Sequence, residues 1–415
     1  MNGSLTLSPT LARRLAIIRQ HLAGPRPQAD SHGIMDVMRD LRYLQIDPMR
    51  VVEQSHLLVL WSRLGKYDQT HLDRLLWEEK QLFEDWAQAT SIVLTEDYPI
   101  FSALKSRFAS GNQPWAQRIR SWMKKNEPFR RYILEQLRLK GPLPSNDLED
   151  RAIESWQSTG WTKSRNVDMM LLFLRARGEI MVAGHKGRRK LWNPTARHLP
   201  EWAPREHLSD HEVYLSIAQK SLRALGVARA VHVKQHFTRG CCKNVEHVMA
   251  QLEEENRVVR VEVRERKQVW RGPWYVHADD LSLIDRLEAG EWDPRTTLLS
   301  PFDNLICDRK RTEQLFNFHF RFEVYAPKDK RKYGCYVMPI LRGDRLIGRV
   351  DPVIDRGRRC LTISAVYVEP DIEVTDKTVE AVADSVRELA GFLGAEKIAY
   401  GQQVPKRWKA MGVGW

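Results

Sequence analysis

Residues 174–192 read LRARGEIMVAGHKGRRKLW, and a related pattern, LEEENRVVRVEVRERKQVW, occupies residues 252–270. In each copy a helical segment ends at a residue that tolerates a left-handed backbone, Gly178 or Asn256, and an apolar stretch follows. The stretch leads into a basic turn and then a second short strand that ends in tryptophan. This order of helix, strand, basic turn and strand is typical of the back half of a winged helix, and the several matches at one offset make chance the minority interpretation.

Helical patterns precede both copies and would complete two winged-helix units. They cover residues 127–140 and about 163–177 for one unit, and about 210–225 and 229–238 for the other. The N-terminal region carries a weaker version, in which Leu76 and Leu82 take the places of Leu174 and Ile180. We therefore predict an α+β protein with three tandem winged-helix units, of which the first is the least regular.

The N-terminal region also contains patterns typical of amphipathic helices and one pair of strands. Ser8 and Ser31 are candidate N-caps for the first two helices. The expected helices are residues 8–22, 31–42, 54–64, 69–80, 95–108 and 113–125, and the expected strands are 82–86 and 91–94.

After about residue 290 the chain becomes rich in β-branched and aromatic residues, and Arg342-Gly343-Asp344 is a candidate hairpin turn. Closely spaced short strands favour a small barrel or a curled sheet. The expected strands are 296–306, 318–326, 333–341, 345–351, 359–368 and 396–400, with a helix at 376–393. The predicted domains are 1–126, with the first winged helix, 127–205 and 206–290, with the second and third, and 291–415, which is barrel-like.

The charge balance favours a polyanionic partner. Lys and Arg number 66 against 53 Asp and Glu, for a net charge of +13, which is typical of proteins that bind nucleic acid. No apolar run reaches the length of a membrane-spanning helix, and the N-terminus lacks the pattern of a secretory signal. The five cysteines form no C-x-x-C pair, so we expect neither a zinc site nor a disulfide framework, and a reducing cytoplasm as the compartment.

The candidate catalytic pair is Gln45 and Asp47, within the segment LQIDPMRVV, residues 44–52. In an extended segment these two side chains would face the same side, and Pro48 favours an extended backbone at the preceding residue. A carboxylate beside an amide can hold and deprotonate a water molecule. The alternative is a short strand with two polar residues facing solvent. His56, one helix further on, either faces this site or is a core histidine.

The C-terminal region carries a longer and more specific pattern. It reads SPFDNLICDRKR at residues 300–311, LFNF at 315–318, EVYAP at 323–327, KYG at 332–334 and GRVD at 348–351. Together with LQID at 44–47, this pattern resembles the winged-helix DNA glycosylases that repair interstrand crosslinks, the AlkZ-like and YcaQ-like family, over nearly the whole chain. The resemblance implies three winged helices and a β-barrel around duplex DNA. It also implies excision of N7-alkylated purines, including purines that bridge two strands.

The same resemblance assigns the family's Q-x-D signature to Gln45 and Asp47. No lysine lies within the motif to form a Schiff base, so we expect a monofunctional glycosylase, and one that requires no metal or cofactor. Its partner is duplex DNA that carries alkylated or crosslinked purines, and we expect a monomer associated with the nucleoid. The family branch usually reads W-A-H-E-A where this chain has WAQAT, residues 86–90, so that Gln88 and Ala89 replace a histidine and a glutamate. That departure leaves the range of accepted adducts open.

Basic residues of the predicted hairpin turns and barrel are the candidate phosphate contacts. They are Arg188, Arg189, Lys267, Arg309, Arg311, Arg331, Lys332 and Arg349. The alternative for any single one is an ordinary solvated surface charge. Two other classes of protein also fit a basic winged-helix chain, a non-enzymatic transcriptional regulator and a protein-interaction scaffold.

Overall fold

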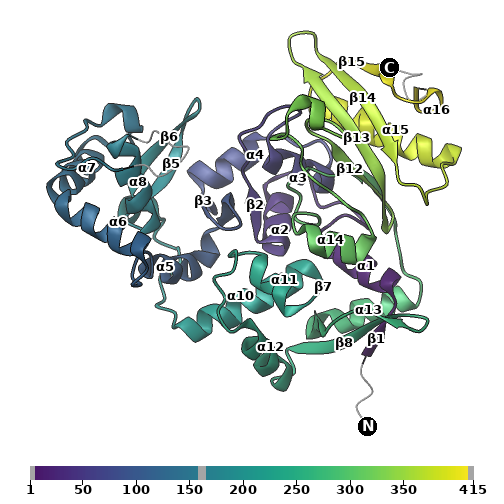
Figure 1. Cartoon of the computed structure of the whole chain (residues 1–415), viewed down its shortest axis with the longest axis horizontal. Helices are drawn as coiled ribbons and strands as arrows, with labels where there is room; N and C mark the ends of the chain where they lie inside the picture. The colour runs from purple at the N-terminus through teal and green to yellow at the C-terminus, as the bar shows by residue number, and fades with distance from the viewer. Residues whose placement is uncertain (1–4, 158–164, 410–415) are drawn as a thin grey trace. The chain divides into compact units, whose positions relative to one another are not determined.

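The computed structural model describes residues 5–157 and 165–409, and all structural statements below concern these residues (Figure 1). The chain forms two compact units. Unit 1 contains the chain up to Leu72, the short stretch Trp86–Ile92 and everything from Tyr214 onward, whereas unit 2 contains Asp73–Asp85 and Val93–Val213. The chain passes from one unit to the other after Leu72, Asp85, Ile92 and Val213, so neither unit is a single continuous stretch of sequence.

The N-terminal part supplies a helix, a short strand, two more helices and a hairpin. Its elements are α2 (Ser31–Leu41), β2 (Tyr43–Gln45), α3 (Ser55–Leu64), α4 (Thr70–Asp73), a π-helical turn (Arg74–Glu78), β3 (Leu82–Trp86) and β4 (Thr90–Leu94). The three strands form one sheet in the order β2-β4-β3. The short strand after the first helix thus pairs with the second strand of the hairpin.

Unit 2 repeats this order of elements. It contains a 3-10 turn (Thr95–Asp97), α5 (Tyr98–Ser106), α6 (Pro114–Lys125), α7 (Glu127–Lys140), a second 3-10 turn (Ser145–Asp147), α8 (Asn166–Ala176), β5 (Ile180–Lys186), β6 (Arg189–Pro194) and α9 (Thr195–His198). Leu143, just after α7, forms a single bridge to Trp192 of β6. The helix predicted at about 163–177 corresponds to α8, and its first two predicted residues lie outside the described residues.

Unit 1 contains a third copy of the order. Its elements are α10 (Asp210–Leu225), which begins in unit 2, β7 (Val227–Ala228), α11 (Ala230–Gln235), α12 (Val245–Glu254), β8 (Val258–Glu265), β9 (Gln268–Val269) and β10 (Trp274–His277). β7 pairs with β10, again the strand that ends the hairpin. The N-terminal strand β1 (Leu5–Leu7) adds to this sheet parallel to β8, and α1 (Pro9–Ile18) follows it.

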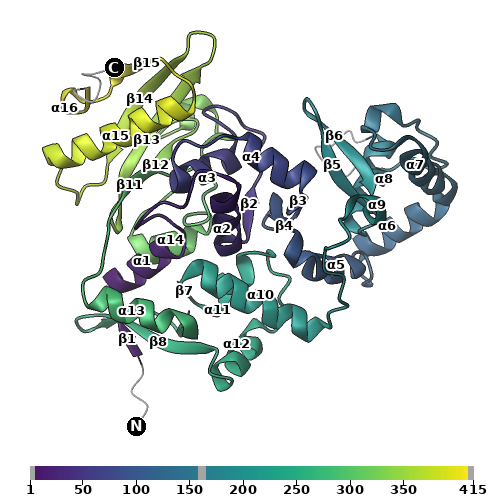
Figure 2. The ribbon, with the colours of Figure 1, turned by 180° about the vertical axis from the view of Figure 1, so that it is seen from behind.

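The C-terminal strands form an open five-stranded sheet in the order β11-β12-β13-β14-β15. The elements of this part are a 3-10 turn (Ala278–Asp280), α13 (Leu281–Glu288), β11 (Thr296–Leu298), α14 (Arg309–Phe316), a 3-10 turn (Lys328–Lys330), β12 (Met338–Arg342), β13 (Arg345–Asp355), β14 (Cys360–Val368), α15 (Asp376–Phe392), β15 (Lys397–Gln403) and α16 (Lys406–Lys409). In Figures 1 and 2, α15 lies along this sheet, and Ser385 Oγ of α15 donates a hydrogen bond to the carbonyl oxygen of Thr296 in β11.

This sheet corrects the predicted barrel, because among the described strands β11 and β15 are its two edges and do not pair with each other. The strand predicted at 318–326 is also wrong, since these residues adopt no regular strand. Their aromatic residues, which suggested a strand, pack as single side chains instead. Phe318 and Phe320, for example, stack with ring centroids 6.3 Å apart within the core of unit 1.

The repeat that decided the sequence-based prediction is confirmed in its local geometry. Gly178 and Asn256 have φ of 76° and 55°, so both helices end in the left-handed conformation that the pattern indicates. The N-cap at Ser8 is confirmed, since its hydroxyl accepts from the Leu11 N–H. The second helix, however, is capped by Asp30, whose side chain accepts from the Gly33 N–H, rather than by Ser31.

Candidate functional site

The Q-x-D motif lies at the end of β2 and in the segment that leads to α3. β2 ends at Gln45, so Asp47 stands two residues beyond the strand. The hydroxyl of Ser55, the first residue of α3, donates to the Gln45 carbonyl oxygen (2.5 Å) and accepts from the Asp47 N–H (2.9 Å). One serine thus fixes the backbone on both sides of Ile46, which holds the two motif residues in a defined relation.

The Asp47 carboxylate is nearly buried, with 7% of the residue exposed. Its Oδ1 accepts a hydrogen bond from the Met49 N–H at 2.9 Å. Burial raises the pKa of Asp47, and the Met49 hydrogen bond opposes this only in part. A carboxylate that is desolvated without a compensating cation is a strong acceptor for a proton or for developing positive charge, and such groups cluster at functional sites.

The other carboxylate of this segment, Glu53, is equally buried but fully neutralised. Arg50 donates to both of its oxygens (2.5 and 2.9 Å), and Arg356, from the turn between β13 and β14, donates to Oε2 (3.0 Å). Burial raises the pKa of Glu53, but the hydrogen bonds from Arg50, the Gln54 N–H and Arg356 outweigh it and leave the pKa below its ordinary value. Glu53 therefore anchors the segment, whereas Asp47 remains available for chemistry.

An aromatic cluster lies within the electrostatic reach of both carboxylates. Tyr336 is fully buried, and its pKa is raised above the ordinary tyrosine value by burial, with Asp47 and Glu53 adding to the shift. Its ring packs edge-on against Phe322 (5.7 Å between centroids), and Phe322 in turn contacts Tyr325, which is 81% exposed. The site thus has an apolar wall that reaches the surface of unit 1.

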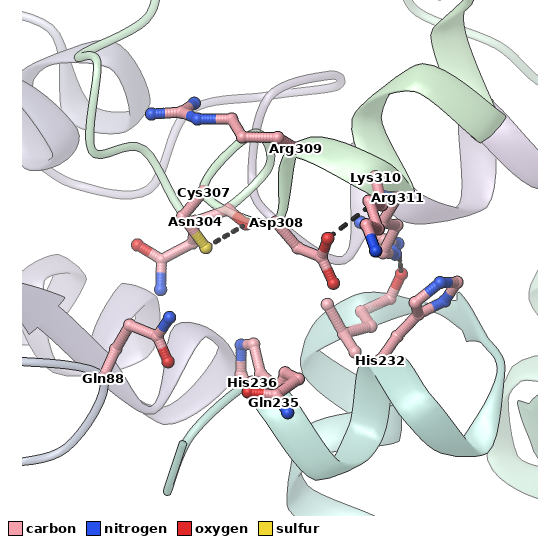
Figure 3. A pocket seen from close by; sticks show the side chains of 11 residues that line it. Gln88, His232, Gln235, His236, Asn304, Cys307, Asp308, Arg309, Lys310 and Arg311 are labelled. Carbon is pink, nitrogen blue, oxygen red and sulfur yellow. Dashed lines mark hydrogen bonds between the residues drawn. The ribbon is translucent and has the colours of Figure 1, made fainter. Parts of the chain in front are cut away.

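A cavity of about 300 Å³ lies beside β2 in unit 1 (Figure 3). Asn304 Nδ2 donates to the carbonyl oxygen of Tyr43 (3.0 Å), the first residue of β2, and the Tyr43 ring packs edge-on against His236. The residues that line the cavity are Gln88, Leu225, His232, Gln235, His236, Asn304, Cys307, Asp308, Arg309, Lys310 and Arg311.

The described residues contain no cluster of three or more histidine, cysteine or carboxylate side chains with the spacing of a metal site. All five cysteines are free thiols. In the same described part of the chain, none of the helices combines the length and apolarity needed to cross a lipid bilayer.

The comparison with known proteins decides the class of this protein. A family model described as "DNA glycosylase AlkZ-like" matches residues 38–392. The chain belongs to this family. A solved structure with the same fold is that of the Streptomyces sahachiroi DNA glycosylase AlkZ, which superposes with a TM-score of 0.67 at 16% identity, over 97% of this chain and 100% of that one.

The AlkZ-like protein is therefore a DNA glycosylase, an enzyme that acts on DNA. This assignment confirms the resemblance read from the C-terminal pattern. It also sets aside the two non-enzymatic alternatives, the transcriptional regulator and the interaction scaffold.

Four of the predicted phosphate contacts are accessible or partly accessible in the glycosylase. Arg188 and Arg189 are exposed at the turn between β5 and β6 of unit 2, where Gly187 has a φ of 61°. Lys267 is exposed at the turn between β8 and β9 of unit 1. Lys332 is exposed and lies 4.9 Å from the centre of the Tyr333 ring.

The other four arginines are bonded within unit 1. Arg311 and Arg349 are each 1% exposed; Arg311 donates to the carbonyl oxygens of Leu225 (2.6 Å) and Val227 (3.2 Å), and Arg349 pairs with Glu369. Arg309 and Arg331 are half-buried. Arg309 donates to the Ile306 (2.7 Å) and Pro301 (2.8 Å) carbonyls, and Arg331 donates to those of Ala326 (3.0 Å) and Val324 (3.1 Å).

Sequence reasoning missed the residues that surround the motif. Ser55, Glu53 and Arg356 carried no signal because serine, glutamate and arginine are common, and Arg356 is more than 300 residues from Glu53 along the chain. Gln88 was noted only as a departure from the family pattern, yet it lines the cavity beside β2. His56, left open between site and core, is 9% exposed within α3.

Proposed function

We propose that the glycosylase hydrolyses the N-glycosidic bond of N7-alkylated purines in duplex DNA, with Asp47 as the catalytic carboxylate and Gln45 as its partner. The observation that carries this proposal is the contrast within one short segment. Asp47 is buried and has a raised pKa, whereas Glu53 is neutralised by two arginines. Of the two carboxylates, Asp47 is the one whose environment suits it to act on a developing cation.

The chemistry of an N7-alkylated purine explains why one carboxylate suffices. The alkylated base is already cationic, so the electron pair of the C1′–N9 bond can leave with the base without prior protonation, and the base departs neutral. The sugar then carries oxocarbenium character, which the Asp47 carboxylate stabilises electrostatically. Water forms the new bond to C1′, and its proton passes to Asp47 and then to solvent, with the Gln45 amide as a second hydrogen-bonding group for that water.

We propose further that the three repeated sets of elements are winged-helix units, as predicted. Each set has helices followed by a hairpin, and its short strand or strand-like residue pairs with the second hairpin strand, β4, β6 or β10. The exposed cations Arg188, Arg189, Lys267 and Lys332 are the proposed phosphate contacts. Arg311 and Arg349 are left out because their guanidinium groups are buried and already bonded.

The same reaction releases one arm of an interstrand crosslink, because each arm is an N7-alkylated purine. We therefore include crosslinked purines among the proposed substrates. Gln88 and Ala89 replace a histidine and a glutamate of the family pattern. In this proposal the replacement changes which adducts are accepted and leaves the cleavage of the N-glycosidic bond unaffected.

The test is incubation with duplex DNA that contains a single N7-methylguanine, followed by gel analysis with and without alkali. The proposal predicts free base in solution and strand breaks only after alkali, since the motif contains no lysine that could form a Schiff base. A heat-denatured sample controls for spontaneous depurination. Breaks without alkali would overturn the hydrolytic part, and an unchanged duplex would overturn the proposed substrate.

A further inference from the structure

The cavity beside β2 contains buried polar groups that lack hydrogen-bond partners in the described structure. His236 is 4% exposed, and neither of its ring nitrogens is bonded. Asn304 is 2% exposed, and its Oδ1 is unbonded although its Nδ2 is held by Tyr43. Unpaired buried polar groups cost about 1–3 kcal/mol each, so the His236 ring and Asn304 Oδ1 are candidate partners for a ligand in this cavity.

Three of the residues that line this cavity can accept hydrogen bonds, through Asn304 Oδ1, the Asp308 carboxylate and a His236 ring nitrogen. Asp308 caps α14 through Oδ1, which accepts from the Arg311 N–H (3.1 Å), and a carboxylate has acceptor capacity to spare. In Figure 3 the Asp308 carboxylate extends toward the Arg311 side of the cavity, above His232. Burial, with Arg311 and Arg42 adding to the effect, lowers the pKa of His236 to about 3, so this ring is neutral and offers one donor and one acceptor.

The two arginines that line the cavity, Arg309 and Arg311, are already engaged by backbone carbonyls, whereas Lys310, which also lines it, is exposed. Arg311 donates to the Leu225 and Val227 carbonyls, and Arg309 donates to two other carbonyls while its side chain extends away from the cavity in Figure 3. The Asp308 carboxylate occupies the N-terminus of α14, where a phosphate would otherwise bind. A cavity of about 300 Å³ with these groups suits one planar heterocycle that is rich in donors or cationic.

Two residues that line the cavity contact the first residue of the strand that leads to the motif. Tyr43 of β2 is bonded to Asn304 through its backbone and contacts His236 through its ring. The Ile46 N–H, inside the motif, donates to the Thr90 carbonyl oxygen (2.8 Å). Thr90 begins the strand after the turn that carries Gln88, and the Gln88 amide nitrogen can donate to the Gln235 (2.8 Å) and His236 (3.1 Å) carbonyls.

We propose that this cavity receives the alkylated base, turned out of the duplex, and that Asp308 determines specificity for N7-alkylguanine. This inference rests on the proposed function and identifies the base-binding part of the same site. The N1–H and 2-amino group of guanine are two adjacent donors on the Watson–Crick edge, and the Asp308 carboxylate accepts both. The positive charge that N7-alkylation adds is attracted to the same carboxylate, which selects damaged guanine over normal guanine. Reading a turned-out base by its Watson–Crick edge is a general strategy of enzymes that act on bases.

The test measures binding of nucleosides without any cleavage. Isothermal titration of the intact protein compares 7-methylguanosine, which is cationic and has both donors, with guanosine, which lacks the charge, and with 7-methylinosine, which lacks the 2-amino group. We expect 7-methylguanosine to bind best, and Asp308→Asn to weaken its binding by about 10- to 100-fold, the range of one bidentate pair. Asparagine is as good an N-cap as aspartate, so α14 is retained.

Two further variants make the result decisive. Asp30 also caps a helix, α2, by accepting from a backbone N–H, so Asp30→Asn is the matched control and should bind normally. Asp308→Ser keeps a capping side chain but is too short to reach a ligand, and it should lose binding as Asp308→Asn does. Normal binding by both Asp308 variants would overturn the proposal, and so would competition by inorganic phosphate.

The outcomes separate this proposal from the proposed function. If methylated duplex is cleaved normally by Asp308→Asn, the base pocket is wrong and the proposed function stands. If wild-type protein releases no base but binds 7-methylguanosine in a manner that depends on Asp308, the pocket stands and the proposed reaction is wrong.

Discussion

Asp47 and Glu53 lie six residues apart, are about equally buried and have opposite pKa shifts. Asp47 is 7% exposed and its pKa is raised, whereas Glu53 is 5% exposed and its pKa is lowered. The difference comes from their partners. Two arginines donate to Glu53, while the recorded hydrogen bond to the Asp47 carboxylate comes from a backbone N–H.

If Asp47 has the proposed catalytic role, this segment carries one carboxylate for stability and another for chemistry. Arg356 reaches Glu53 from the turn between β13 and β14 and also donates to the Val52 carbonyl (2.7 Å), so the Glu53 cluster ties the motif segment to the C-terminal sheet. Asp47 keeps an unfavourable, desolvated charge in place because that cluster and Ser55 hold the backbone around it. Retaining such a cost is expected where a charge is needed in the transition state.

The largest effect on stability should come from the anchoring carboxylate. Glu53→Gln removes charge-assisted hydrogen bonds to Arg50 and Arg356, each of the kind worth about 1.5–3 kcal/mol when buried. Because both arginines are partly exposed, we expect the low end, about 2 kcal/mol less stability in urea unfolding. Base release should also fall, because the motif segment loses its anchor. An unchanged unfolding midpoint with lost activity would instead place Glu53 in the chemistry.

The pH dependence should separate the two carboxylates. An ordinary aspartate has a pKa of about 3.9. Because the pKa of Asp47 is raised, its ionised form, which is the proposed active form, is lost at a higher pH than this as acid is added. The lowered pKa of Glu53 means that its stabilisation is complete above about 4.3, the unfolded glutamate value, and disappears only as pH falls through its lower folded value. We therefore expect a mildly acidic range in which the protein remains folded but releases base slowly.

This range can be measured by single-turnover release and circular dichroism at the same series of pH values. Asp351 is the necessary control, because burial raises its pKa to about 6. If the fall in release rate at low pH persists in Asp351→Asn, the result supports Asp47 as the group that titrates. If the fall disappears in that variant, the titrating group is Asp351.

The smallest expected effect concerns residues that neither carboxylate contacts. Lys267→Ala should weaken duplex binding to a similar degree for all sequences and reduce the slope of log affinity against log salt by about one unit. Arg349 is buried and paired with Glu369. Replacing Arg349 should therefore lower the stability of the protein rather than remove a phosphate contact, which contrasts with Lys267→Ala. Binding titrations at several salt concentrations test both. A strong sequence preference that depends on Lys267 would contradict a role limited to phosphate contact.

The sequence could predict what depends on local pattern. The matched helix ends at Gly178 and Asn256 adopt the same left-handed conformation because both positions must turn a helix into a strand. The turn at Gly343 between β12 and β13 is confirmed in the same way. The C-terminal pattern, which occurs in the linear chain, led to the family that the comparison shows, whereas the roles of Gln45 and Asp47 stay predictions.

What the sequence could not predict depends on distant partners. Aromatic residues between Phe318 and Tyr325 were expected to form a strand, but they pack as separate side chains in loops. Arg311 resembled a phosphate contact until its carbonyl partners near residue 226 were known. The raised pKa of Asp47 likewise requires the burial that residues far along the chain create, and no spacing rule contains that information.

The central claim is that the Asp47 carboxylate acts in catalysis at a cost to stability. Single-turnover release of N7-methylguanine, duplex affinity and thermal unfolding of Asp47→Asn, measured on one preparation, test it most directly. A positioned catalytic group is worth about 10²–10⁴ in rate, so we predict a loss of that size with near-normal affinity. The unfolding temperature should be equal or higher at neutral pH, because the variant no longer buries a charge. A lower unfolding temperature, with rate and affinity reduced together, would show that Asp47 is structural and contradict the account.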